Sequence, residues 1–121
     1  MNDLKEIFGD IISSYTAQDA ENDGVLVNVT DFAKEVGFKW TVRISNGVHN
    51  LCTPPKSNKI QSYKGRLWDV LSLAFFAIKR SSDEGLIAYN VKIGRKLEKL
   101  WITIDGTMGE PALHIITPSE Y

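Results

Sequence analysis

Cysteine, histidine and proline are scarce in this 121-residue chain, and each shortage excludes a class of protein. One cysteine cannot form an internal disulfide or build a cysteine-based zinc site. Nine glycines and four prolines are too few for a collagen-like or low-complexity chain. The longest apolar stretch, Leu67–Ile78, is interrupted by Asp69 and Ser72 and is shorter than the roughly 18 residues of a membrane span. The first ten residues lack the basic start and apolar run of a signal peptide. We therefore expect a single cytoplasmic domain over residues 1–121, with no membrane partner.

Apolar periodicity predicts mostly helices in the first half of the chain. The apolar residues between Leu4 and Ile12 follow the spacing of an amphipathic helix, and Thr16 opens a second, short helix. A strand is expected over residues 25–29, followed by a helix that Thr30 caps and Gly37 ends. Residues 38–44 alternate between apolar and polar, which predicts a strand with one buried and one solvent-facing side. Ser45 is positioned to cap a further short helix through Cys52.

The segment from Tyr63 to Arg80 carries the clearest helical pattern in the chain. Some of its apolar residues form one stripe along the helix, and the others extend this apolar surface around most of the helix circumference. This pattern predicts a central helix that is buried on nearly every side. Three strands are expected after it, around residues 87–93, 100–104 and 113–115, joined by short connections that favour an antiparallel meander. The predicted fold class is α+β, with the central helix and shorter N-terminal helices packed on a mainly antiparallel sheet that ends in a three-strand meander.

Charge is distributed unevenly along the chain. Residues 1–35 carry eight acidic and two basic side chains, a net charge of −6, and the remainder carries twelve basic and seven acidic ones, a net charge of +5. Residues 39–66 contain no acid. This asymmetry indicates either a surface for nucleic acid or an acidic partner, or acidic helices that pack near a basic loop and offset its charge. The candidate partner-binding or nucleic-acid-binding residues are Lys56, Lys59, Lys64, Lys92, Arg95, Lys96 and Lys99, with Trp101 or Tyr89 as a base-stacking side chain.

The residue types that carry catalysis form no recognisable constellation. There is no phosphate-binding glycine motif, and the two histidines stand far apart in sequence. His49 and Cys52 are three residues apart and could form a nucleophilic thiol–imidazole pair, so an enzyme that uses His49, Cys52 or Asp69 is a third hypothesis. The structural alternatives are a small buried thiol at Cys52 and an ion pair between Arg66 and Asp69, which are three apart on the expected helix. We therefore predict a protein that is not an enzyme and has no cofactor and no metal site.

Several local motifs occur in an order typical of one protein family. They are Phe8-Gly9-Asp10 with Tyr15, Asp23-Gly24-Val25-Leu26-Val27, Ala33-Lys34-Glu35-Val36-Gly37-Phe38, Gly65-Arg66-Leu67-Trp68-Asp69-Val70-Leu71, and Gly109-Glu110-Pro111. In these motifs the chain resembles a family of small uncharacterised bacterial proteins encoded on plasmids, phages and other mobile elements. The resemblance implies an accessory task, such as blocking a host defence system or assisting transfer of the element, and it implies no specific activity or site residue.

Two functions from different classes remain alongside the enzymatic one. The first is a non-catalytic interaction protein that binds a macromolecular partner, with an inhibitor of a bacterial defence system as one form of it. The second is a nucleic-acid-binding accessory protein that uses the basic loop and hairpin. The oligomeric state and the identity of the partner cannot be read from these patterns.

Overall fold

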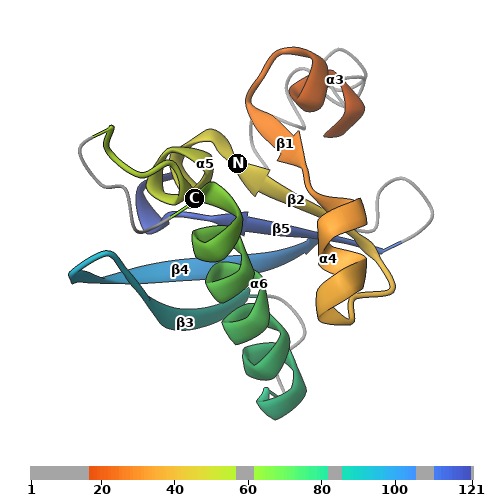
Figure 1. Cartoon of the computed structure of the whole chain (residues 1–121). Coiled ribbons are helices and arrows are strands. Elements are labelled where there is room, and N and C mark those ends of the chain that lie inside the picture. Colours follow the sequence, from red (N-terminus) through yellow and green to blue (C-terminus); the bar gives the residue numbers. More distant parts are fainter. Residues whose placement is uncertain (1–16, 57–61, 82–85, 106–110, 121) are drawn as a thin grey trace.

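The computed structural model describes residues 17–56, 62–81, 86–105 and 111–120 (Figure 1). The chain is an α+β protein in which helices pack on one mixed five-stranded sheet. The helices are α3 (Ala17–Asn22), α4 (Thr30–Val36), α5 (Asn46–Cys52) and α6 (Tyr63–Arg80), with a short 3-10 helix, η1 (Pro118–Glu120). The strands are β1 (Leu26–Asn28), β2 (Thr41–Ser45), β3 (Leu86–Ile93), β4 (Lys96–Asp105) and β5 (Ala112–Ile116). The helix expected between Leu4 and Ile12 lies outside the described residues.

The sheet has the strand order β1-β2-β5-β4-β3. Strands β3, β4 and β5 form the predicted antiparallel meander, and Gly94 has the positive φ of 63° that its tight turn requires. The last strand returns beside β2 and runs parallel to it, with Val42 opposite Leu113 and Ile44 opposite Ile115. Three of the four pairings are therefore antiparallel, and the parallel one joins the two halves of the chain.

Helices α4, α5 and α6 lie on one face of this sheet (Figure 1). Helix α6 packs along β3 and contacts α4 and α5 at its flanks. Its bounds agree with the predicted segment, because the Ser62 hydroxyl accepts a hydrogen bond from the Gly65 amide and caps the first turn. The Tyr89 hydroxyl on β3 donates to the Val70 carbonyl over 2.9 Å, which fixes the helix against the strand. The α6 side chains buried in this interface are Leu67, Val70, Leu71 and Ala74.

The prediction that α6 is buried on nearly every side is wrong. Trp68, Leu73 and Phe76 keep 44%, 38% and 56% of their surface exposed. The sheet lies on one side of the helix, and α4 and α5 reach its flanks, so none of the described helices and strands covers the side that points away from the sheet.

Strand β2 begins three residues later than predicted, and its polar side is not open to solvent. Phe38 stays buried although it precedes the strand, because it packs edge-on against Phe75 with 5.3 Å between ring centroids. Trp40, expected on the buried face, is exposed instead. Arg43, expected to face solvent, is buried because α3 brings Glu21 to the opposite face of the sheet, where the two side chains form an ion pair.

The helix ends follow the predicted pattern at two of three positions, Ser45 and Gly37, but not at Thr30. The Ser45 hydroxyl accepts from the Val48 amide and begins α5, and Gly37, with a φ of 128°, ends α4. Thr30 is not the cap of α4, since its amide instead donates to the Asn28 side-chain oxygen over 2.9 Å. Asn28 precedes Thr30 by two residues, and a side-chain oxygen that accepts from the amide two residues later forms an Asx turn.

The C-terminal turn is anchored to the sheet through the carboxylate of Glu120. Its oxygens accept hydrogen bonds from the Ser45 hydroxyl at 2.6 Å, the Gly47 amide at 3.0 Å, and the Thr117 amide and hydroxyl at 2.8 and 2.7 Å. Burial alone raises the pKa of Glu120, but these bonds outweigh burial and lower the pKa below its usual value. The chain end thus closes over the start of α5.

Candidate binding surface on helix α6

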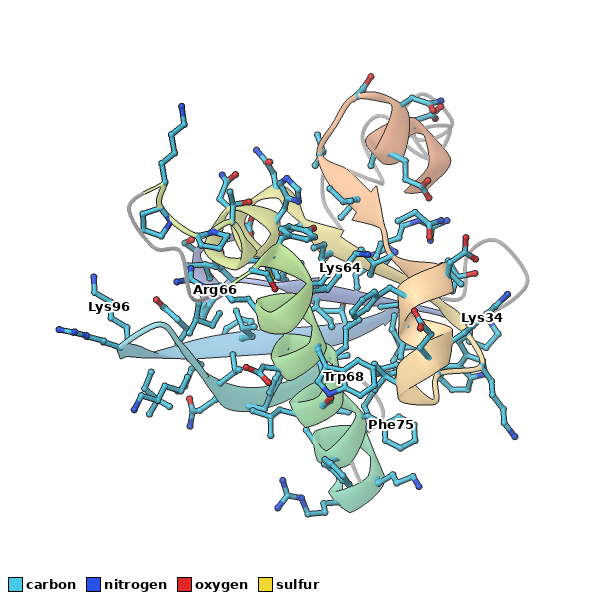
Figure 2. The ribbon with its side chains drawn as sticks, in the orientation of Figure 1. Lys34, Lys64, Arg66, Trp68, Phe75 and Lys96 are labelled. Atoms are coloured by element: carbon cyan, nitrogen blue, oxygen red, sulfur yellow. The ribbon has the colours of Figure 1, made fainter. Side chains whose placement is uncertain are left out.

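The predicted basic residues gather around the N-terminal half of α6 and the β3–β4 hairpin. In Figure 2, Lys64 and Arg66 lie on the first turns of α6, and Lys96 lies at the tip of the hairpin. Lys59 lies outside the described residues. The remaining predicted lysines and arginine are all exposed: Lys56, Lys64, Lys92, Arg95, Lys96 and Lys99.

A surface cavity of about 610 Å³ separates the first half of α6 from the hairpin. The structure brings Arg66, Asp69 and Lys92 together at its wall, whereas the other predicted cations lie outside it. The described residues that line it are Ser62, Gly65, Arg66, Trp68, Asp69, Lys92 and Gly94.

Sequence analysis predicted Trp101 as a stacking side chain, but the tryptophan that lines this cavity is Trp68. Trp101 is half-buried on β4, opposite Ala88 and Ile116, and already has an interaction partner. Trp68 is exposed and makes an edge-on contact with Phe32 of α4 at 6.1 Å between centroids. A signal for this was present in the sequence, since Lys64 and Ser72, four residues to either side, place polar groups on the helical stripe of Trp68.

The apolar residues Trp68, Leu73 and Phe76 define what we call the α6 outer face. Phe76 contacts Phe75 edge-on at 6.2 Å and is the most exposed of the three. Figure 2 shows Trp68 and Phe75 on the side of α6 nearer to α4. The α6 outer face therefore continues from the cavity towards the C-terminal end of the helix, and exposed aromatic groups on a helix are typical of protein interfaces.

The predicted ion pair between Arg66 and Asp69 does not form. Among the described residues the salt bridge is that between Arg43 and Glu21, and Asp69 is exposed. The Arg66 guanidinium instead donates to the Leu51 carbonyl over 3.1 Å. Leu51 lies in the last turn of α5, where a backbone carbonyl lacks a helical partner, so α5 draws the guanidinium away from Asp69.

His49, Cys52 and Asp69 do not converge on one pocket. The Nδ1 atom of His49 lies 2.8 Å from the Tyr63 hydroxyl, and Cys52 is fully buried. Burial raises the pKa of the Cys52 thiol to about 11, although the Arg66 guanidinium partly opposes this effect. A thiol in this state is poorly nucleophilic, because the thiolate is the reactive form. Asp69 faces the cavity on α6. The three groups therefore do not form the nucleophilic arrangement that the sequence suggested.

The described residues form neither a metal centre nor a helix that could span a membrane. No group of three or more His, Cys, Asp or Glu side chains in residues 17–56, 62–81, 86–105 and 111–120 is placed to hold a metal ion. In the same ranges, no helix combines the length and the hydropathy needed to cross a bilayer.

Comparisons with known proteins give no match. A scan against protein-family models, a search of curated proteins and a search of solved structures each found nothing similar to this chain. The candidate surface therefore has to be interpreted from its own chemistry.

Proposed function

We propose that this chain is a non-catalytic macromolecule-binding protein whose partner is a protein that packs on the α6 outer face. The observation that carries the proposal is the exposure of Trp68, Leu73 and Phe76 on a helix whose opposite side is fully packed. Exposed aromatic side chains of this kind dominate the energy of protein interfaces, because they lose a large apolar surface to water on binding.

The charged groups around the α6 outer face give such an interface a polar rim. Asp69 and Lys92 line the cavity beside Trp68, and Lys79 and Arg80 follow Phe76 at the end of the helix. An apolar centre surrounded by charged side chains is the usual anatomy of a transient protein interface. The rim favours an orientation of the partner, whereas the aromatic centre supplies most of the affinity.

Matched variants and site-directed cross-linking test this proposal. Photo-reactive side chains at positions 68 and 76 are expected to cross-link one protein from a bacterial host lysate, and one at position 97 is not. Leu97 is a suitable control because it is 71% exposed but lies on the hairpin. We expect Trp68→Ala and Phe76→Ala each to weaken the complex with the cross-linked protein by about 30-fold, which corresponds to a hot-spot loss of about 2 kcal/mol, while Leu97→Ala changes nothing. Equal cross-linking at all three positions would contradict the proposal.

A second candidate function, binding of single-stranded nucleic acid, is favoured by the cations beside Trp68. Arg66 and Lys92 line the cavity in which the indole is exposed, and an aromatic ring among cations is the usual platform for an unpaired base. Fluorescence anisotropy with a labelled 12-nucleotide DNA or RNA strand tests it. Binding must weaken steeply with added salt and with Lys92→Glu, and retention of affinity in Lys92→Glu counts against it.

The resemblance to proteins of mobile elements supports an accessory role for this binding. In this proposal the partner is a component of a bacterial defence system, which the protein inhibits by covering its surface. The test is transfer of a plasmid into cells with and without a defined defence system, in the presence of the wild-type protein or its Trp68→Ala variant. Transfer that rises only with the wild-type protein supports the role, and equal transfer with both proteins counts against it.

A further inference from the structure

A second hollow, which adjoins the α6 outer face at Lys79, lies where the end of α4 meets α6 and the start of β2. It has a volume of about 370 Å³, within the range of about 300–1,000 Å³ typical of small-molecule pockets. Its described lining is Gly37, Phe38, Lys39, Trp40, Phe75, Ile78, Lys79 and Leu113. Figure 2 shows Phe75 extending from α6 towards the end of α4, where its ring forms the floor between the two helices.

The wall of this hollow is shaped by the glycine that ends α4. A Cβ atom added at Gly37 meets the Phe75 ring at 3.3 Å, so the ring packs directly against the glycine backbone. The amides of Gly37 and Phe38 both donate to the Ala33 carbonyl and are therefore not available to a ligand. The ring surfaces of Phe38, Phe75 and the exposed Trp40 are left to make an apolar contact.

The charged groups at this hollow are both cations. Lys79 holds its Nζ atom 4.6 Å from the centroid of the Phe75 ring, and Lys39 is the other charged residue of the described lining. The described lining residues include no acid, and neither lysine forms an ion pair with a carboxylate of the described residues. An apolar lining that carries two ammonium groups and no acid among its described residues is complementary to a ligand that has an apolar chain and one negative end.

We infer that this hollow, between Phe38, Trp40 and Phe75, binds an aliphatic carboxylate of the fatty-acid type, with Lys39 and Lys79 holding the carboxylate. A polypeptide terminus fits less well, because its backbone carbonyls would lose water without gaining the Gly37 and Phe38 amides as donors, since both amides already donate to the Ala33 carbonyl. This site does not depend on the function proposed for the α6 outer face.

Titration of the full chain with decanoate, decanol and decylammonium, followed by two-dimensional NMR and calorimetry, tests the inference. We expect decanoate to bind with a dissociation constant at or below about 1 mM and to shift the amide signals of residues 37–40 and 75–79. Decanol should bind more weakly and decylammonium weaker still. Shifts in other regions only, or equal affinity for decanoate and decylammonium, would overturn the assignment.

Variants separate the charged and the apolar parts of the site. Lys39→Gln and Lys79→Gln should each weaken decanoate binding by about two- to fivefold, as expected for a partly exposed ion pair, and leave decanol binding unchanged. Trp40→Ala should weaken both ligands, whereas the control Lys96→Gln should affect neither. Decanoate binding that is unchanged in Lys39→Gln and Lys79→Gln refutes the role of the lysines. A peptide that ends in leucine with a free carboxylate, if it binds more tightly than decanoate, replaces the fatty-acid assignment with a polypeptide terminus.

Discussion

The ion pair between Arg43 and Glu21 joins α3 to an interior strand, so its removal should have a large effect on stability. The two side chains are only 11% and 17% exposed. Asn28 Nδ2 also lies 3.3 Å from the same Glu21 oxygen, and Arg43 Nη1 lies 3.4 Å from His114 Nε2. Removing one partner of a fully buried pair costs about 3–5 kcal/mol, because the remaining charge is left without a counter-ion. Since some of each side chain reaches water, we expect about 2–3 kcal/mol for Glu21→Ala.

Urea unfolding, followed by circular dichroism, measures this loss in a double-mutant cycle. We expect Glu21→Ala and Arg43→Met each to lower the free energy of unfolding, and the double variant to lose less than the sum, because no unpaired charge remains in it. Glu35→Ala on the exposed side of α4 is the control and should change stability by less than about 0.5 kcal/mol. An effect of Glu21→Ala as small as that of Glu35→Ala, or strictly additive losses, would refute the reasoning.

Three further predictions, which use four substitutions, test single features of the fold. Hydrogen bonds lower the pKa of Glu120 in the folded protein, so this carboxylate stabilises the fold above the unfolded pKa of 4.5, and the stabilisation is lost as the pH falls through the lowered pKa. Glu120→Gln should therefore lower the free energy of unfolding by about 1 kcal/mol at pH 7. A loss of stability that persists at acid pH would contradict this prediction. Tyr89→Phe should cost about 1 kcal/mol in thermal or urea unfolding, since it removes only the bond to the Val70 carbonyl, and an unchanged stability would show that this bond contributes nothing. Gly37→Ala and Gly24→Ala both place an alanine at positive φ, which costs about 1–2 kcal/mol, but only the first also meets an aromatic ring, so Gly37→Ala should be the more destabilising of the two.

The elements that sequence analysis predicted correctly are those determined by neighbouring residues. The bounds of α6 follow from the Ser62 cap and the apolar stripe, and the turn at Gly94 follows from the short gap between two alternating segments. Capping and periodicity act over a few residues, so the chain displays them directly. The parallel pairing of β2 with β5 joins segments about 70 residues apart, and no local pattern specifies it.

The errors in predicted burial share one physical origin, which is that burial depends on what the rest of the chain places over a surface. The alternation around Arg43 correctly separates the two faces of β2, but it cannot show that α3 brings Glu21 over the second face. The apolar run of α6 likewise cannot show that nothing in the described structure covers Phe76. The cavity beside Trp68 combines residues of α6 with Lys92 and Gly94 of the hairpin. The sequence could therefore name the candidate lysines, but it could not show which of them line the cavity.

Stability and binding are therefore separable on the two sides of α6. Leu71 is fully buried, and its truncation to alanine leaves a cavity, at a typical cost of about 2–5 kcal/mol. Phe76, on the other side of the same helix, already has more than half of its surface in water, so its replacement sacrifices little packing. Trp68 still packs against Phe32 of α4, so its replacement should cost more stability than that of Phe76. A Phe76→Ala variant therefore separates the proposed binding from stability more cleanly than Trp68→Ala does.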